Sequence, residues 1–371
     1  MAHVRKEGNT WYYYIDLGRD QNGKRMIKKK RGFKSEKEAK KALTEIMYEI
    51  DKGTYVEPSS LLFRDFLNQW LDHKEKIKKL KGTSLFQLRT LTRTHISPAL
   101  GHIKLSDLNQ LHIQSFLNES IDKGLSDVTV QRFYTMINDA LKYAVKFGLL
   151  SKNVCDFIER PSIEKKQMNF WNVDEVKQFL SVAKDERNYI VFHLALTTGM
   201  RQCEILGLTW DNVDLKKGLI YVRQQLLRNT KKFSTLKTKA SNRNIAISDE
   251  TIAILKSHKK RIAEERLMSD SNYTEMNLVC PTSNGTPYLT GNITKIFKRL
   301  IKKAGVKEIR FHDCRHTFAS LLLQHQNTNP KIVAEILGHS NVRTTLDTYS
   351  HLLPNMQQET VKQFGNMLFG N

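Results

Sequence analysis

Residues 309–352 read IRFHDCRHTFASLLLQHQNTNPKIVAEILGHSNVRTTLDTYSHL, and this stretch sets reactive side chains among residues that favour amphipathic helices. Arg315 precedes three apolar residues by three, four and seven positions, the spacing of one helix face: Phe318, Ala319 and Leu322. A guanidinium on a buried face is costly unless it meets an anion. The stretch therefore predicts a helical region with an inward-facing arginine at an anion-binding site.

A second and a third helix are expected further along the same stretch. Pro330 favours a helix start and Gly338 favours a helix end, and His339 follows directly. Beyond it, Tyr349 shares a helical face with the residues that precede it at helical spacing, namely Val342, Thr345 and Leu346. The phenol of Tyr349 is therefore also expected to face inward.

Four side chains of this stretch can converge: Tyr349, His312, His339 and Arg315. A phenolic nucleophile with cationic groups suits attack on a phosphodiester, because the transition state carries extra negative charge. Each residue also has a purely structural interpretation, Tyr349 as a core aromatic and His339 as part of a helix cap. His312 and His316 have the spacing of zinc ligands, but the glutamate of a zincin motif is missing, so we expect no metal.

Composition points to a polyanionic partner. The 371 residues include 60 Lys and Arg against 38 Asp and Glu, a formal net charge of +22. Nucleic acid is the leading candidate, and a membrane surface is the alternative. No apolar run approaches the roughly 20 residues that span a bilayer, and the N-terminus has no signal-peptide pattern. The cysteines form no CxxC pair, so reduced thiols in a cytoplasmic, nucleoid-associated protein are expected.

The first segment, residues 1–57, predicts a small sheet and one helix. Residues 11–17 form an aromatic, β-prone run, Asn-Gly marks a hairpin turn, and residues 24–30 form a second strand. Ser35 and Glu38 predict a capping box at the start of a helix. Cations crowd the second strand and suggest contact with a DNA groove: Lys24, Arg25, Lys28, Lys29, Lys30, Arg31 and Lys34. A solvated edge strand kept soluble by lysine is the alternative.

The second segment, residues 62–160, is helical throughout. Apolar spacing predicts helices at residues 63–71, 83–96, 108–122 and 126–147, which together make a bundle. Basic residues on these helices can contact the phosphates of a duplex: Arg89, Arg93 and Arg132. Ordinary solvated surface charge is the alternative interpretation.

The third segment, residues 168–371, mixes helices with short strands. Residues 189–198 predict a helix, after which Arg201 faces inward with Glu204 near enough to orient it. Strands are expected at residues 219–223, 233–238 and 244–247, the last two joined as a hairpin by a turn at residues 240–243. Lys237 lies just before that turn, where it can act as a general acid; Lys239 lies two residues on.

The ordered motifs of the chain resemble those of the tyrosine recombinase, or phage-type integrase, family. They are Thr-Gly-Met-Arg201, Leu-Lys237-Thr-Lys, His312-x-x-Arg315, Leu-Gly-His339 and Thr-Tyr349. The resemblance covers the whole chain and implies a multi-domain, mainly α protein with small β-sheets. It divides the chain into an arm-type DNA-binding domain (sheet plus helix), a helical-bundle core-binding domain and an α+β catalytic domain.

The resemblance also implies a mechanism. Tyr349 attacks the scissile phosphate and forms a 3′-phosphotyrosyl link, while Arg201 and Arg315 hold the non-bridging oxygens. His312 and His339 donate further hydrogen bonds, His312 can accept the tyrosine proton, and Lys237 protonates the leaving oxygen. No metal, ATP or other cofactor is implied. Four protomers on two attachment sites exchange strands through a Holliday junction, and an excisionase or a host DNA-bending protein can assist.

Two other classes fit part of the sequence. A type IB topoisomerase uses the same chemistry to relax supercoils, but it needs no second class of binding site such as the basic N-terminal sheet offers. A basic DNA-binding protein without catalysis explains the charge, but it has no use for Tyr349 beyond packing. Integration or excision of a mobile element is therefore the function that the sequence favours.

Overall fold

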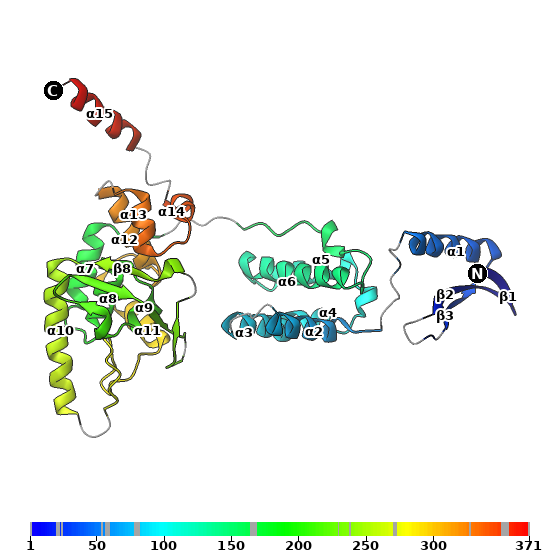
Figure 1. The fold of residues 1–371 in the computed structure, drawn as a ribbon, viewed down its shortest axis with the longest axis horizontal. Coiled ribbons are helices and arrows are strands. Elements are labelled where there is room, and N and C mark those ends of the chain that lie inside the picture. The colour runs from blue at the N-terminus through cyan, green and yellow to red at the C-terminus, as the bar shows by residue number, and fades with distance from the viewer. Residues whose placement is uncertain are drawn as a thin grey trace. The chain divides into compact units, whose positions relative to one another are not determined.

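The computed structural model describes residues 2–19, 23, 25–52, 55, 60–77, 82–163, 169–228, 230–236, 239–269, 273–325, 328–349 and 356–369. It divides into an N-terminal unit (Met1–Lys165) and a C-terminal unit (Lys166–Asn371), each described here by itself. The chain is mainly helical with small sheets, which confirms the predicted fold class (Figure 1).

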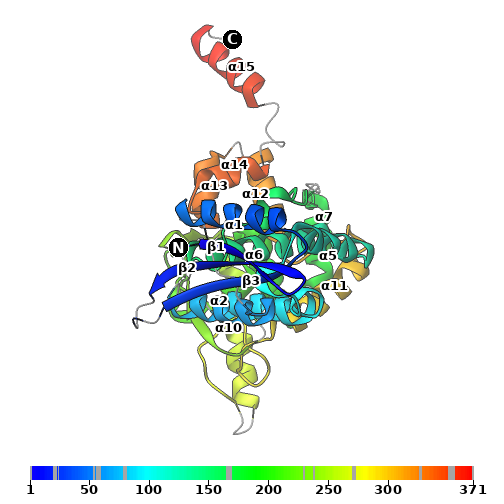
Figure 2. The same ribbon diagram turned by 90° about the vertical axis from the view of Figure 1, so that its right-hand side faces the viewer.

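The N-terminal unit begins with an antiparallel sheet in the order β1-β2-β3, built from β1 (Ala2–Glu7), β2 (Thr10–Arg19) and β3 (Arg25–Phe33). Helix α1 (Glu36–Asp51) covers one face of it (Figure 2). Tyr13 and Ala39 are buried where helix and sheet meet. The sequence does not predict β1, because only Ala2 and Val4 of its sequence AHVRKE are apolar, too short an alternation to reveal a strand.

The start of α1 differs in one detail from the predicted capping box. The Ser35 hydroxyl accepts a hydrogen bond from the backbone N–H of Glu38 at 3.2 Å, as expected for an N-cap. The Glu38 carboxylate, however, accepts from the backbone N–H of Lys34 at 3.0 Å, one residue before the cap. Two of the free backbone donors are still satisfied, so the helix start is stabilised in nearly the expected way.

The rest of the N-terminal unit is a helical bundle with its own apolar core. Its α-helices are α2 (Phe63–Lys76), α3 (Gly82–Leu91), α4 (Ser97–Leu100), α5 (Gln110–Asp122) and α6 (Asp127–Lys146). A π-helical turn, Thr92–Ile96, joins α3 to α4. Pro98 has no N–H to donate to the carbonyl four residues before it. The residue before Pro98, Ser97, donates its N–H to Thr92 O, which is the hydrogen bond of a π-helical turn. The predicted helix over residues 83–96 therefore changes hydrogen-bond pattern at Thr92.

The C-terminal unit contains the helices α7 (Val173–Ala183), α8 (Tyr189–Thr198), α9 (Gln202–Leu206), α10 (Asp249–Met268), α11 (Thr290–Ala304), α12 (Asp313–His325), α13 (Pro330–Leu337), α14 (Val342–Tyr349) and α15 (Met356–Phe369). Helix α8 is buried along nearly its whole length and packs against α7, α9, α10 and α12. It is the central element around which these four helices gather. Among the described helices, none is long and apolar enough to cross a membrane.

The strands of this unit pair differently from the prediction. Strand β8 (Arg243–Ala246) pairs with β5 (Leu219–Val222), which also pairs with β4 (Val213–Asp214); separately, β7 (Phe233–Thr235) pairs with β6 (Gln224–Leu226). The expected hairpin between residues 233–238 and 244–247 is therefore wrong. Ile245 faces Ile220 across the β5–β8 pair, and both are buried. This apolar pairing selects a distant partner for β8 over its neighbour in sequence.

The helices of the opening stretch match the sequence prediction with one exception. Pro330 starts α13, and Gly338 ends it in the left-handed conformation at φ 69°. On α14, Thr345 and Tyr349 are buried as expected, but Leu346 is 40% exposed. The two-turn helix α14 packs through a narrow stripe, and Leu346 lies beside that stripe rather than within it.

Gly199 provides a test of how closely α8 is packed against the helices that carry the site. It ends α8 at φ 61°, and an added Cβ would lie 2.6 Å from Phe318 and 2.9 Å from Leu337. Gly305 ends α11 at φ 65° with open space around it. Both Gly→Ala changes should cost about 1–2 kcal/mol for the left-handed backbone, and Gly199→Ala should cost about 1–3 kcal/mol more for overpacking.

Denaturant unfolding of the two variants measures this difference directly. Equal losses of unfolding free energy would show that the contact between α8 and the α12–α13 region is looser than described.

Candidate active site

Arg201 is placed by the sharp turn that ends α8. The left-handed Gly199 reverses the chain, and Arg201 becomes the N-cap residue of α9. Its guanidinium donates to Glu204 Oε1 at 2.7 Å, and its backbone N–H donates to Glu204 Oε2 at 3.0 Å. The Arg201 side chain is 34% exposed whereas that of Glu204 is 1% exposed. The expected ion pair therefore holds the arginine at the edge of the core, with part of its guanidinium accessible.

The Glu204 carboxylate is shared by a second guanidinium, that of Arg243 on β8. Arg243 Nη2 donates to Glu204 Oε2 at 2.8 Å, and the Arg243 side chain is 5% exposed. Burial by itself raises the pKa of Glu204, but the Arg243 hydrogen bond and the charges of Arg243 and Arg201 outweigh it and lower the pKa. Glu204 is therefore ionised, and it orients Arg201 as a charged acceptor.

Arg315 is buried as the helical spacing predicted, at 3% exposure. Its guanidinium donates to two backbone carbonyls, Gly199 O at 2.9 Å and Leu337 O at 2.5 Å. Burial, followed by repulsion from Arg201, lowers the pKa of Arg315 to about 9. Within the described residues no carboxylate forms an ion pair with it. Arg315 is thus a buried cation that an incoming anion would stabilise.

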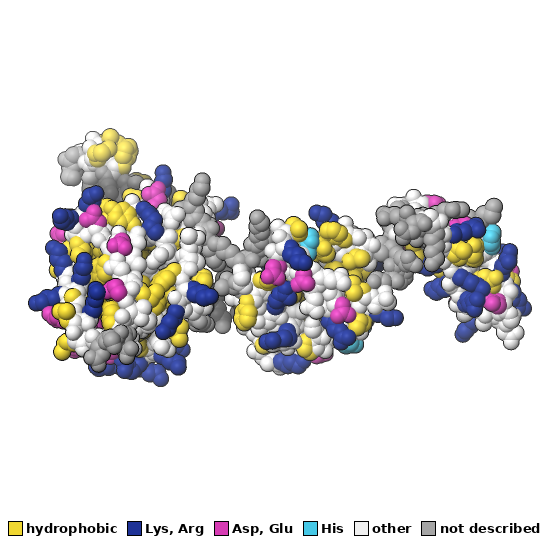
Figure 3. Space-filling model, turned by 60° about the horizontal axis from the view of Figure 1, so that its bottom comes forward, with side chains coloured by type: hydrophobic (Ala, Val, Ile, Leu, Met, Phe, Trp, Pro, Cys, Tyr) yellow, Lys and Arg dark blue, Asp and Glu magenta, His cyan; other side chains and the backbone are white. Residues whose placement is uncertain are grey.

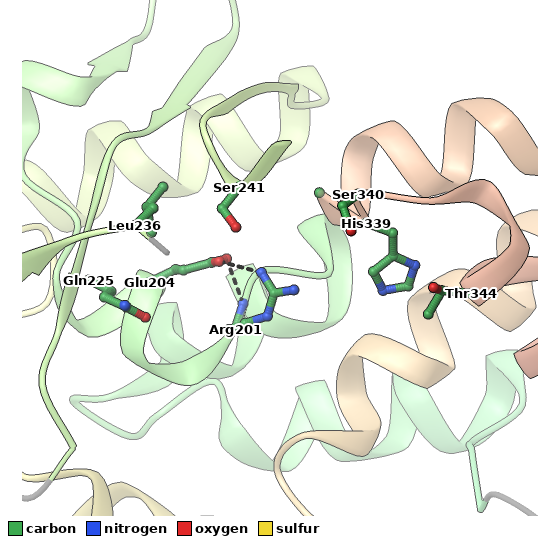
Figure 4. Close-up of a pocket in the computed structure, with 9 residues that line it drawn as sticks. Arg201, Glu204, Gln225, Leu236, Ser241, His339, Ser340 and Thr344 are labelled. Carbon is green, nitrogen blue, oxygen red and sulfur yellow. Dashed lines mark hydrogen bonds and ion pairs between the residues drawn. The ribbon is translucent and has the colours of Figure 1, made fainter. Parts of the chain in front are cut away.

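A pocket of about 350 Å³ opens beside these arginines. Figure 4 shows Arg201 and Glu204 on one side of it and His339, Ser340 and Thr344 on the other. The backbone N–H of His339 donates to Ala334 O at 3.0 Å and closes the end of α13, while the His339 ring bonds Thr345 Oγ1 at 2.8 Å. His339 therefore serves the helix cap with its backbone and lines the pocket with its side chain.

Tyr349 lies outside the lining of this pocket. Its side chain is buried, and its hydroxyl forms a 2.7 Å hydrogen bond with Nδ1 of His316. The phenol donates when the imidazole carries its proton on Nε2. Burial raises the pKa of Tyr349, partly offset by the nearby charge of Arg315, and burial lowers the pKa of His316 to about 4. Both groups are therefore neutral near pH 7.

His316 is the contact that sequence analysis missed. In the sequence, His316 stands out only for its zinc-ligand spacing from His312, because nothing there links α12 to the end of α14. His312 stacks edge-on against His316 with ring centroids 5.2 Å apart. Burial, then the charges of Arg315 and Arg201, lower the pKa of His312, so this residue lies within electrostatic range of both arginines.

Lys237 lies outside the described residues, and the same is true of the side chain of Lys239. Leu236 and Ser241, which flank this segment in sequence, both line the pocket. The structure therefore brings five of the six predicted catalytic residues into one region, namely Arg201, His312, Arg315, His339 and Tyr349.

Several cations predicted to contact DNA have partners within the chain. Arg25 pairs with Asp16 at 2.6 Å, while Lys29 and Arg31 both pair with Glu7. Arg89 bonds Asp72 and Glu75. Four further cations predicted to contact DNA are exposed: Lys30, Lys34, Arg93 and Arg132. Lys28 donates to the Tyr55 hydroxyl, and Lys24 lies outside the described residues. Basic side chains are dispersed over the face in view, with acidic side chains interspersed among them (Figure 3).

Comparison with known proteins identifies the family. The model of the phage integrase family matches residues 169–356, the span that contains the whole pocket. The chain belongs to the phage integrase family. An arm DNA-binding domain also matches residues 3–50, and a phage integrase N-terminal SAM-like domain matches residues 62–121.

Curated relatives of this integrase-family chain match most of its length. It is 29% identical to a tyrosine recombinase XerC-like protein of Caldanaerobacter subterraneus, over 98% of this chain and 97% of that protein. It is also 29% identical to the ICEBs1 integrase of Bacillus subtilis, over 74% of this chain and 75% of the relative. Family membership confirms the predicted tyrosine-type site-specific recombinase, and the comparisons support neither the topoisomerase nor the non-catalytic alternative.

Solved structures of integrases share the fold. The Tn1549 transposon integrase in complex with a circular intermediate DNA superposes with a TM-score of 0.70 at 22% identity, covering 82% of this chain and 100% of that chain. A lambda integrase dimer bound to a core site gives 0.61 at 18% identity, covering 94% and 96%.

The histidines of this unit predict an acid-sensitive fold. Burial lowers the pKa of four of them from 6.5 to about 4: His193, His258, His316 and His339. As pH falls from 6.5 toward 4 the unfolded chain takes up these protons first, so the free energy of unfolding should fall within that window and level off above it.

Calorimetry between about pH 7.5 and about pH 5 checks this expectation, since the ordinary histidine pKa is about 6.5. A melting temperature that stays constant over this range would contradict the buried, neutral histidines.

Proposed function

We propose that this chain integrates or excises a mobile element by cutting and rejoining double-stranded DNA at attachment sites. The observation that supports this most is the buried guanidinium of Arg315, which donates to carbonyls but pairs with no carboxylate within the described residues, next to a pocket lined by Arg201 and His339. A phosphodiester in that pocket supplies the anion that the two arginines require.

The proposed cleavage step uses Tyr349 as the nucleophile. Its hydroxyl loses a proton and bonds to phosphorus, while the bond from phosphorus to the 5′ oxygen breaks and that oxygen takes up a proton. The product is a 3′-phosphotyrosyl link with a free 5′-hydroxyl. Because the phenol is buried against His316 and does not line the pocket, α14 must shift to bring it to the phosphate.

The remaining groups take supporting roles in this proposal. Arg201 and Arg315 hold the non-bridging oxygens, and His312 and His339 donate further hydrogen bonds to them. Lys237 protonates the leaving 5′ oxygen. For the tyrosine proton, His316 joins His312 as an acceptor, since it already contacts the phenol. The cations of the step are side chains, so the proposal includes no metal.

Complete recombination needs more than one protomer. Two rounds of strand exchange through a Holliday junction require four copies of the chain on two DNA sites, acting in the cytoplasm at the nucleoid. Residues 1–57 would bind arm-type sites, residues 62–160 would bind core-type sites, and residues 168–371 would carry out catalysis. A small excisionase or a host DNA-bending protein can set the direction.

Tyr349→Phe tests the nucleophile. The change removes one hydroxyl and its hydrogen bond to His316, worth about 1 kcal/mol of stability, and should abolish the covalent protein–DNA complex on nicked attachment-site DNA while DNA binding persists. Tyr189→Phe is a matched control, because Tyr189 also contacts a histidine, His193, but has no part in the proposed cleavage step. A covalent complex formed by Tyr349→Phe would disprove the assignment.

Removing residues 1–57 tests the division of labour between DNA-binding regions. All six proposed catalytic residues remain, so covalent cleavage of a core site should persist while protection of a separate repeat in the attachment DNA is lost. Each lost phosphate contact should also flatten the salt dependence of binding by about one unit. Footprinting of the full-length and truncated proteins on attachment-site DNA shows whether the N-terminal sheet reads a separate site. If both protect the same single region, the N-terminal sheet does not read a second site.

A further inference from the structure

Arg243 belongs to none of the motifs that the sequence shows. It is the first residue of β8 and follows the 3₁₀ turn Lys239–Ser241. Its side chain is 5% exposed, and it runs under the pocket toward α9 and α13. Alternate residues of β8 are buried, and Arg243 takes one of those inward positions where an apolar residue is usual.

The first set of Arg243 contacts reaches Glu204. Nη2 donates to Oε2 at 2.8 Å and Nη1 to Oε1 at 3.3 Å, so the two side chains meet in the two-pronged geometry that a guanidinium and a carboxylate favour. Glu204 in turn accepts from both the side chain and the backbone of Arg201. The position of the Arg201 guanidinium therefore depends, through one carboxylate, on Arg243.

The second set of contacts reaches the other two segments that border the pocket. Arg243 Nη1 donates to Ser241 O at 3.2 Å, which fixes the turn after the Lys237 segment. Arg243 Nε donates to Ile336 O at 2.5 Å, near the end of α13. Gly338 lies so close that an added Cβ would be 3.0 Å from Arg243 Cδ, and His339 follows it. One guanidinium thus joins α9, the turn before β8 and the end of α13.

We infer that Arg243 is a positioning residue for DNA cleavage, which sets the relative positions of Arg201, the turn before β8 and His339. The inference rests on the proposed function and deepens it. Only arginine fits this role, because its planar group presents several donors in fixed directions while a lysine ammonium is a single point charge. Arg243 itself does not line the pocket, so it acts through the groups that do.

Arg243→Lys tests the inference because it keeps the positive charge beside Glu204 but loses the paired hydrogen bonds of the guanidinium. Misplacement of catalytic groups by about 1 Å can reduce a rate by about 10²-fold. We expect single-turnover cleavage of nicked attachment-site DNA to slow by about 10- to 100-fold, with the dissociation constant for that DNA nearly unchanged. Combined with Glu204→Gln, the second change should add little, since both act on the same contact.

Arg187→Lys is the matched control. Arg187 also holds a carboxylate, a hydroxyl and a carbonyl, those of Glu265, Tyr288 and Pro281, and none of these residues lines the pocket. It should lower the melting temperature by a similar amount while cleavage stays near the wild-type rate. The inference is overturned if Arg243→Lys cleaves like wild type, or if Arg187→Lys slows cleavage equally. If wild-type protein forms no Tyr349-dependent covalent complex, the proposed function fails instead.

Discussion

Three guanidiniums lie near one carboxylate in the C-terminal unit, and only two of them bond it. Arg201 and Arg243 bond Glu204, while buried Arg315 bonds only backbone carbonyls among its described contacts. Three positive charges against one negative leave an excess of two in a region largely removed from water. Burial is the main cause that lowers the pKa of Arg315 to about 9, and repulsion from Arg201 and Arg243 adds to it. A phosphate in the adjoining pocket would offset the excess positive charge, so the charge balance favours the DNA-bound state over the free one.

The fold brings these charges together by ending helices at one place. Gly199 ends α8 and Gly338 ends α13, and both adopt the left-handed conformation that lets the chain turn sharply. The carbonyls of Gly199 and Leu337, freed at these helix ends, are the two acceptors of Arg315. Helix termini thus supply Arg315 with backbone partners, and among the described residues no carboxylate pairs with its guanidinium.

Residues whose roles follow from local spacing could be predicted from the sequence. The inward face of Arg315, the end of α13 at Gly338 and the pairing of Arg201 with Glu204 each depend on neighbours within one or two helical turns. Contacts between distant segments could not be predicted in the same way. Arg243 reaches Ile336, His316 reaches Tyr349, and β8 pairs with β5, and no periodicity in the sequence encodes these partners. The exposed Leu346 shows that even a correct helix does not fix the width of its buried face.

We propose that an ordered set of arginines and histidines prepares a phosphodiester for attack by one buried phenol. Mass spectrometry of the proteolysed covalent complex tests this proposal, because the DNA-linked peptide identifies both the attacking residue and the DNA end attached to it. The account predicts a single adduct, at Tyr349, carrying a 3′-phosphate with the 5′ end free. An adduct on another residue, or a link to a 5′-phosphate, would contradict it.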